Sequence, residues 1–413
     1  MSSRRNFMVG TAAGAAVLPF VAGQSQAGAA VGDTQTLVVM FLRGGCDGLS
    51  VLSPVGESAY HDARPSVAVP ESAALPLGSV APNPTFGWHP AATELSRLYD
   101  SGRVAVVPSA GTPDHSRSHF DCQDGMEAGR PENRYSVNGG WLGRYLASTA
   151  SSDHPLRAFS AATGLPPSLA GYGAISAQWL DQLGLISWGP DPDFAMAAIR
   201  AGYTPERAGG DLAMWAGITG DALGEVAPLL EGEVRPPDTW PDSYHADRLF
   251  TIARLIEEGM PVQVATVDMG GWDHHDDMGS ATDSGARTHS HVRSLDAAIG
   301  AFFDRLDAGG HGNDVTLVTM TEFGRRFAEN DSGGLDHGFG SQMLMVGSGL
   351  TPGVHGPWPG VGPSELEGGD LAVTVDYRSV LSEVLTRNMG AGDLSSVFPG
   401  FDTSAGSFVG VTS

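Results

Sequence analysis

The chain has 413 residues, of which 47 are acidic and 23 are basic, so its formal net charge is −24. A field of that sign repels phosphate backbones and anionic lipids, which excludes nucleic acid as a partner. The composition is 41% hydrophobic and 17% charged, with apolar residues along the whole length, and this indicates a globular protein. The carboxylate excess has two compatible interpretations, solubility outside the cytoplasm and the binding of divalent cations.

The N-terminus carries a targeting pattern. Ser3-Arg4-Arg5-Asn6-Phe7-Met8 matches the twin-arginine signal, and a Gly- and Ala-rich apolar run, Val9–Ala22, follows it. That run is too short to span a bilayer permanently, and small residues after it offer cleavage sites. We therefore predict a signal peptide over residues 1–29, the twin-arginine translocase as a partner during export, and a periplasmic, cell-surface or extracellular location. No later run has 18 consecutive apolar residues, so no stable membrane span is expected.

Apolar, β-branched runs alternate with helical patterns along the rest of the chain. The pattern predicts strands and helices, in order, as follows: strand 36–42, helix 89–100, strand 104–107, helix 120–128, strand 262–267, helix 287–308, and strands 315–320 and 343–346. Such an alternation is typical of a doubly wound α/β fold, a mostly parallel sheet with helices on both faces. We expect one domain over 30–413, in which 150–260 is a helical, cap-like insertion.

Ionisable residues cluster at the ends of these strands. The clusters are Asp47 with Ser50, residues 114–119, Asp268 with residues 272–277, residues 322–325, and, ahead of the last strand, residues 336–338. Ligands of open parallel sheets bind outside the carboxyl ends of the strands. Because several clusters meet at one edge, a solvated loop is a poor explanation for the set.

The residue types at this edge suit a divalent metal ion such as zinc or manganese, since carboxylate oxygen and imidazole nitrogen are its usual ligands. The candidate ligands are Asp273, His275, Glu322, Asp336 and His337. Alternatives remain, because Asp273 and His275 can form a polar turn, and Glu322 can pair with a neighbouring arginine. Three further histidines are expected at the surface or behind the ligands: His274, His289 and His291.

A serine nucleophile is a second candidate feature. Ser116 and Ser118 stand where a strand turns into a helix, whose positive amino end favours an anionic substrate. Ser118 is the preferred catalytic hydroxyl and Ser116 the reserve, with Arg117 as the partner of an oxyanion. The competing interpretation is that Ser118 is an ordinary helix N-cap.

Five motifs together resemble one exported bacterial family, the domain-of-unknown-function 1501 proteins. They are Phe41-Leu42-Arg43-Gly44-Gly45, Arg117-Ser118-His119-Phe120, Gly271-Trp272-Asp273 with His275, Thr321-Glu322-Phe323-Gly324-Arg325, and Gly334 with Asp336-His337-Gly338. The resemblance covers the mature chain and implies an alkaline phosphatase-like fold, with two metal ions acting on phosphate or sulfate esters. It places Asp47 near a metal-binding aspartate of that superfamily. The chain departs from the superfamily after Glu322, where an expected histidine is replaced by Phe323.

The leading hypothesis is therefore a metal-dependent hydrolase whose substrate is a small-molecule or polyanionic phosphate or sulfate ester. One alternative is a non-catalytic extracytoplasmic binding or assembly protein that retains the fold. Another is a metallohydrolase of a different polyanionic or polysaccharide substrate. Cys46 and Cys122 lie beside strand-end motifs expected at the same edge, so we expect them to touch. Whether they form a disulfide after export stays open at this point.

Overall fold

A computed structural model describes residues 35–78, 83, 85–149, 154–184, 197–198, 201–204 and 210–413. The predicted signal peptide, residues 1–29, lies outside the described residues. Within the described part of the chain, no helix is both long enough and apolar enough to cross a membrane.

The centre of the protein is a nine-stranded sheet. Its strands, in order across the sheet, are β11 (Gly353–Val354), β5 (Val104–Gly111), β10 (Ser341–Gly347), β9 (Val315–Met320), β1 (Thr36–Leu42), β8 (Val264–Met269), β6 (Ala158–Ser160) and β7 (Ile175–Ser176), and β12 (Val375–Asp376) also pairs with β5. The strand β1 pairs in parallel with both β8 and β9, in the middle of the sheet. The sheet is thus mostly parallel, as predicted.

The strand β10 is the exception, since it pairs antiparallel with both β9 and β5. The sequence pattern placed this strand correctly but gave no sign of its direction, because a fully buried strand looks the same either way. Its direction has a consequence for the site. The residues that precede an antiparallel strand lie at the edge where its parallel neighbours end.

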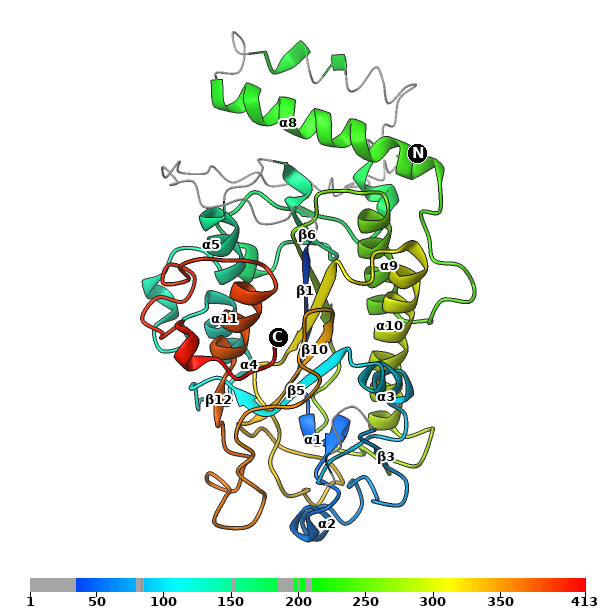
Figure 1. Ribbon diagram of the computed structural model, residues 1–413, viewed down its shortest axis with the longest axis vertical. Helices are drawn as coiled ribbons and strands as arrows, with labels where there is room; N and C mark the ends of the chain where they lie inside the picture. The colour runs from blue at the N-terminus through cyan, green and yellow to red at the C-terminus, as the bar shows by residue number, and fades with distance from the viewer. Residues whose placement is uncertain are drawn as a thin grey trace, which may run out of the picture.

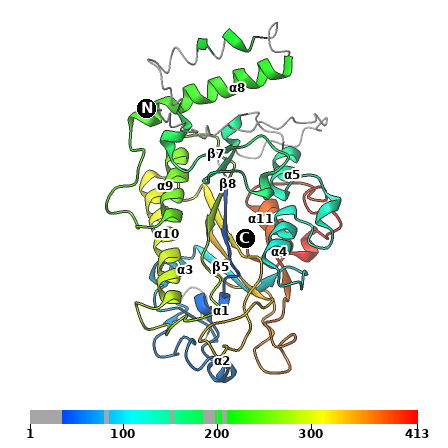
Figure 2. The same ribbon diagram turned by 180° about the vertical axis from the view of Figure 1, so that it is seen from behind.

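Helices cover both faces of the sheet (Figures 1 and 2). One face carries α3 (Thr93–Asp100), α9 (Tyr244–Glu257) and α10 (Arg287–Gly309), and the other carries α4 (His119–Ala128), α5 (Trp141–Ser148) and α11 (Tyr377–Arg387). The central strands are buried on both faces, as their continuous apolar sequences require. The predicted doubly wound α/β fold is confirmed.

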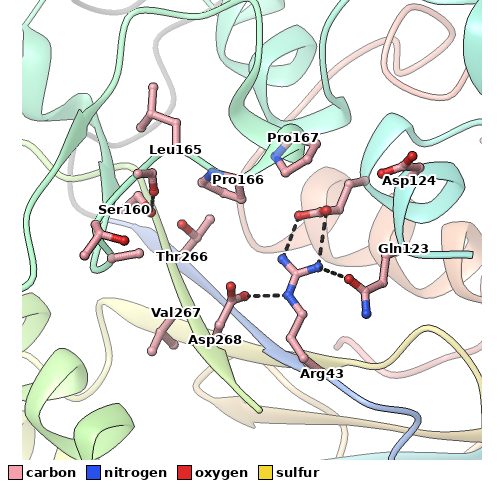
Figure 3. A pocket seen from close by; sticks show the side chains of 14 residues that line it. Arg43, Gln123, Asp124, Ser160, Leu165, Pro166, Pro167, Thr266, Val267 and Asp268 are labelled. Atoms are coloured by element: carbon pink, nitrogen blue, oxygen red, sulfur yellow. Dashed lines mark hydrogen bonds and ion pairs between the residues drawn. The ribbon is translucent and has the colours of Figure 1, made fainter. Parts of the chain in front are cut away.

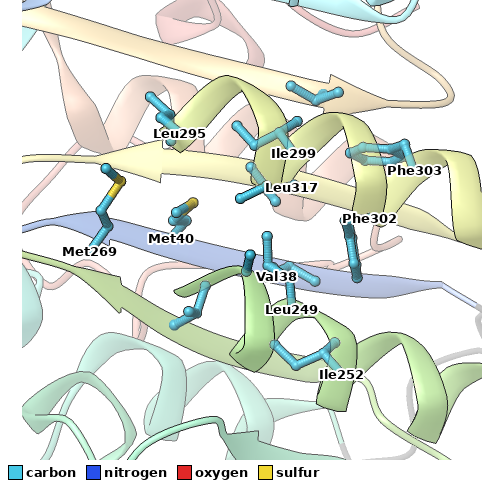
Figure 4. Close-up of a cluster of buried hydrophobic side chains, with 14 of the residues drawn as sticks. Val38, Met40, Leu249, Ile252, Met269, Leu295, Ile299, Phe302, Phe303 and Leu317 are labelled. Carbon is cyan, nitrogen blue, oxygen red and sulfur yellow. The ribbon is translucent and has the colours of Figure 1, made fainter. Parts of the chain in front are cut away.

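Side chains of one strand alternate between the two layers. In β1, Val38 and Met40 point into the core that α9 and α10 cover (Figure 4), whereas Leu37 and Val39 point into the core on the α4 side. This alternation follows from the two-residue period of a strand. The polar residues just beyond each strand continue this alternation, so the same period decides toward which face of the sheet their side chains point.

The segment 150–260 is more than a helical insertion. It supplies β6 and β7 to the main sheet and α9 to one of its faces. Its helix α8 (Gly210–Val226) lies at the opposite end of the molecule from α1 (Gly48–Val51) and α2 (Ser58–Ala63), which follow the carboxyl end of β1 (Figure 1).

A small second sheet lies among the residues that follow β1. It is formed by β2 (Leu52–Ser53), β4 (Gly87–Trp88) and β3 (Leu75–Pro76), with β4 in the middle. Its pairings are antiparallel.

Candidate functional site

Three histidines and one aspartate meet at the carboxyl edge of the main sheet. His119 is the first residue of α4, Asp273 and His275 follow β8, and His337 precedes β10. Residues far apart in the sequence are thus brought to one place, because parallel strands end there and the antiparallel β10 begins there. All four side chains are partly exposed, so the cluster is accessible from solvent.

The ring nitrogens and a carboxylate oxygen come very close together. The Nε2 atom of His337 lies 3.0 Å from Nε2 of His119, 2.9 Å from Nε2 of His275 and 3.3 Å from Oδ1 of Asp273. The Asp273 oxygen is also 3.0 Å from Nε2 of His275 and 3.5 Å from Nε2 of His119. We call these four residues the histidine–aspartate cluster.

The other nitrogen of each histidine ring is held by an acceptor. Nδ1 of His119 contacts Oε1 of Glu322 at 2.7 Å, and Nδ1 of His275 contacts Oδ1 of Asp336 at 2.8 Å. Nδ1 of His337 lies 2.9 Å from the carbonyl oxygen of Arg117. A carboxylate or carbonyl oxygen can only accept, so each Nδ1 carries the proton and each Nε2 of a neutral ring presents a lone pair.

This arrangement needs a positive charge at its centre. Three nitrogen lone pairs surround one carboxylate oxygen. Five of the six distances among these four atoms are 2.9–3.5 Å, and the Nε2 atoms of His119 and His275 form the more distant pair. Metal–ligand bonds of about 2.0–2.1 Å place neighbouring ligands of a tetrahedral ion about 3.3–3.4 Å apart, close to the distances in the cluster. Histidine nitrogens whose other N–H is held by a carboxylate or carbonyl are also the usual form of a metal ligand. The donor set therefore fits a divalent ion.

Arg325 is the nearest buried cation, but it does not supply that charge to the histidines. Its Nη2 atom contacts Oδ1 of Asp273 at 2.7 Å, and its other donors go to backbone carbonyls, among them those of Gly45 and Leu335. Burial raises the pKa of Asp273, but the hydrogen bond and charge of Arg325 outweigh this and lower that pKa to about 2. Asp273 is thus kept ionised, while no N–H of Arg325 reaches an Nε2 atom.

Glu322 is the most deeply buried acceptor at the site, with no exposed side-chain surface. Its Oε1 atom accepts hydrogen bonds from the backbone N–H of Gly44 at 2.9 Å and from Nε2 of Gln123 at 2.7 Å, in addition to the His119 contact. Burial raises the pKa of Glu322, but these hydrogen bonds lower it below its usual value. The hydrogen bond to Glu322 in turn raises the pKa of His119.

Tight backbone approach at two glycines holds the loops of the site together. At Gly334 a Cβ atom would lie 2.2 Å from the backbone carbon of His275, and at Gly338 it would lie 2.4 Å from that of Arg325. Only glycine fits such contacts. Arg117 has a φ of 54°, an uncommon value for a residue with a side chain, and its carbonyl oxygen accepts from His337.

The structure assigns different places to three of the expected metal ligands. Glu322 and Asp336 contact the Nδ1 atoms of histidines, so they position ligands and do not themselves face the centre. Asp47 is buried in an ion pair with Arg64 (2.6 Å), and its carboxylate also accepts from Ser50. It lies outside the cluster because a buried guanidinium already neutralises it. Asp273, His275 and His337 do come together.

The catalytic assignments are corrected in a similar way. The hydroxyl of Ser118 accepts from the backbone N–H of Asp121, which makes it the N-cap of α4. The hydroxyl of Ser116 contacts the thiol of Cys122 at 3.4 Å. The guanidinium of Arg117 pairs with buried Asp370 and stacks on Phe339. None of these polar groups contacts the cluster through its side chain, because each already has a partner.

Cys46 and Cys122 form no disulfide with each other, since both are free and buried. Nor do the remaining histidines of this region join the cluster. His274 is buried, and its burial, together with His291 and Arg287, lowers its pKa to about 3. His289 and His291 contact backbone carbonyls through Nδ1.

His119 is the cluster member that the sequence analysis missed. It is the first residue of α4 and follows Ser118, the predicted nucleophile. One signal was present, since His119 stands within a strand-end cluster and within a motif of the family resemblance. Within the described residues, His119, Asp273 and His337 form the one group of three whose ligand atoms all lie within 4.8 Å of one another.

The fold and the site together define an α/β protein with a histidine–aspartate cluster at the carboxyl edge of a doubly wound sheet. A family profile described as "Protein of unknown function (DUF1501)" matches residues 106–393, more than half of the chain. The chain belongs to that family, as the sequence motifs implied. No curated protein matches the chain.

Among solved structures, the chain is similar to a 2-O GAG sulfatase, with 10% sequence identity and a TM-score of 0.29. The match covers 78% of this chain and 65% of the sulfatase, so the chain spans less than two thirds of that protein. At this level of similarity, nothing about the site follows from it.

Proposed function

We propose that this protein is an exported, metal-dependent hydrolase of phosphate or sulfate esters. The observation that carries the proposal is the convergence of three Nε2 atoms and one carboxylate oxygen, while every Nδ1 atom is held by an acceptor. Without an ion, such a cluster would not stabilise the fold, because it is partly exposed and the lone pairs of its ligand atoms repel one another.

The residues of the chain have separable tasks in this proposal. His119, His337 and Asp273 would hold the ion, with His275 beside them. Glu322, Asp336 and the Arg117 carbonyl fix the ring orientations and keep the Nδ1 protons in place. Arg325 keeps Asp273 ionised. A bound divalent ion would polarise an ester oxygen and lower the pKa of a water molecule, which removes the need for a protein hydroxyl as nucleophile.

The choice of ester comes from the family resemblance, which groups these proteins with alkaline phosphatases and sulfatases. Location outside the cytoplasm is supported by the twin-arginine pattern at Arg4 and Arg5. This pathway carries folded proteins, so a metal ion would be bound before export.

The test measures metal content first and turnover second. The purified protein, supplied with zinc or manganese and then desalted, should retain metal, and His337→Ala and His119→Ala should lose it. His311→Ala is a matched control, because that histidine contacts Asp314 and lies outside the cluster. The metal-loaded protein should then hydrolyse 4-nitrophenyl phosphate or 4-nitrophenyl sulfate. Metal retention by both cluster variants would contradict the proposal.

A second candidate is a non-catalytic binding or assembly protein that retains the fold. The observation in its favour is that both serines near the site are engaged elsewhere, one as an N-cap and one with a thiol. Metal binding without turnover of either aryl ester would support this candidate over the hydrolase.

A further inference from the structure

A cavity of about 370 Å³ lies beside the histidine–aspartate cluster, at the carboxyl ends of β1, β8 and β6 (Figure 3). Arg43, Asp268 and Ser160 stand at these three strand ends and line it. Its volume lies within the range of small-molecule binding sites. Arg43 lies two residues beyond Phe41, and Asp268 lies two residues beyond Thr266. Because side chains of a strand alternate with a period of two, both side chains point to the face of the sheet that α4 covers.

One face of α4 joins the cavity to the cluster. His119, Gln123 and Glu127 are spaced four residues apart, so they lie along the same side of the helix. The Nε2 atom of Gln123 donates to Glu322, which holds His119, and its Oε1 atom accepts from Arg43 at a distance of 3.0 Å. A molecule bound in the cavity would therefore lie next to the proposed metal centre.

Arg43 is almost fully occupied by its neighbours. Its guanidinium donates to both oxygens of Glu127 and to Oε1 of Gln123, and its Nε atom forms an ion pair with Oδ1 of Asp268 at 3.1 Å. These contacts use four of its five N–H groups and leave one donor for a ligand. Three carboxylates, those of Asp124, Glu127 and Asp268, line the cavity together with this single guanidinium. The acidic lining disfavours an anion. Glu127 and Asp268 are already paired with Arg43, so neither offers an unpaired charge to a cation.

Other polar groups at the cavity remain unpaired. Thr266 is 6% exposed, and its buried hydroxyl has no hydrogen-bond partner among the described residues. The shortest contact between Asp268 and Arg43 joins Oδ1 to Nε at 3.1 Å, and 45% of the Asp268 side chain is exposed, so this carboxylate can also accept a hydrogen bond from a ligand. An unpaired buried hydroxyl costs free energy until a ligand or a water molecule satisfies it. An apolar wall stands opposite, formed by Leu165, Pro166 and Pro167 (Figure 3).

We propose that this cavity binds a neutral, hydroxyl-bearing part of the substrate, such as a sugar ring. Hydroxyl groups both donate and accept, so they match the carboxylate oxygens, the remaining guanidinium N–H and the free threonine hydroxyl together. The C–H face of a sugar ring matches the proline and leucine wall. This inference rests on the proposed hydrolase function, and it places the reacting ester at the cluster and the neutral ring in the cavity.

The test compares three sugars of similar size and different charge: glucose, glucosamine and glucuronate. Binding is measured by titration calorimetry or saturation-transfer NMR at pH 7, on the full-length protein with and without added zinc. Glucose should bind, and glucosamine and glucuronate should bind more weakly. Thr266→Val, which keeps the shape and removes the hydroxyl, and Asp268→Asn should each weaken glucose binding about five- to tenfold. Asp402→Asn, an exposed carboxylate outside the cavity, is the control.

Two results would overturn the inference: binding of none of the three sugars, or preferential binding of a charged one. Equal glucose affinity in Thr266→Val and in the wild type would also overturn it, since that variant should fold normally. Failure here and failure of the hydrolase proposal are distinguishable. Retained metal with no sugar binding removes only the cavity inference, whereas sugar binding without metal removes only the metal proposal.

Discussion

The substitution Glu322→Gln separates a residue that positions a ligand from one that binds the metal. The variant can keep the hydrogen bonds of the buried side chain. Its amide oxygen can accept from His119, Gly44 and Gln123, and its NH₂ group would then face the hydroxyl of Thr321, 3.3 Å from the present Oε2 atom. The change thus removes a charge with little change of shape.

The expected effect is a loss of metal affinity with a small effect on folding. Replacing a group that holds a ligand typically weakens metal binding about 10- to 100-fold, which corresponds to about 1.4–2.7 kcal/mol. The free energy of unfolding should fall by only about 1 kcal/mol, as for one weakened hydrogen bond. Asp336→Asn should lose less affinity, because 59% of the Asp336 side chain is exposed, compared with none of Glu322.

Metal affinity is measured by competition with a chromophoric chelator, and stability by urea unfolding of the metal-free protein. Glu383→Gln is the control, since that buried carboxylate accepts hydrogen bonds from Val409, Gly410 and Thr412 and contacts no histidine. It should leave the affinity unchanged. An unaltered affinity in Glu322→Gln, or an equal loss in the control, would refute the reasoning about the Nδ1 contacts.

Three further predictions concern export, packing and acid stability. Replacing Arg4 and Arg5 by Lys should retain the protein in the cytoplasm, which cell fractionation checks; undiminished export would remove the basis for the location. Gly334→Ala should abolish metal retention, because its Cβ would lie 2.2 Å from a backbone atom of the loop after β8; a variant that still retains metal would contradict this. Burial lowers the pKa of His89 and of His245 to about 4, so the stability that they contribute is present above pH 6.5 and is lost as the pH falls towards 4. Between pH 7.5 and 5 each histidine should lower the free energy of unfolding by about 2 kcal/mol. Measured by urea unfolding, the double variant His89→Gln/His245→Gln should therefore lose less stability over this pH range than the wild type.

Much of the fold could be predicted from the sequence, because continuous apolar runs mark buried central strands. The strands β1 and β9 have the predicted bounds, and α10 differs from its prediction by one residue. The short strands β6 and β7 escaped detection, since two or three residues give no periodicity to read. The direction of β10 was equally hidden, because it depends on the tertiary path and not on the local pattern.

The sequence predicted the edge of the sheet at which the site lies and some of its residues, but it did not predict the role of each residue. A carboxylate that binds a metal and one that holds a histidine have the same sequence signature, so Glu322 and Asp336 were assigned as ligands. The role of Asp47 is set by its ion pair with Arg64, which lies 17 residues away, and no local sequence pattern indicates that pairing. His119 was overlooked because its role depends on contacts with residues more than 200 positions away.

The central claim is that the histidine–aspartate cluster binds a divalent ion, and anomalous diffraction from crystals of the zinc- or manganese-loaded protein tests it most directly. The account predicts one anomalous peak at about 2.0–2.3 Å from Nε2 of His119, Nε2 of His337 and Oδ1 of Asp273. Crystals of loaded, desalted protein with no peak at the cluster, or with the ion bound only elsewhere, would contradict it.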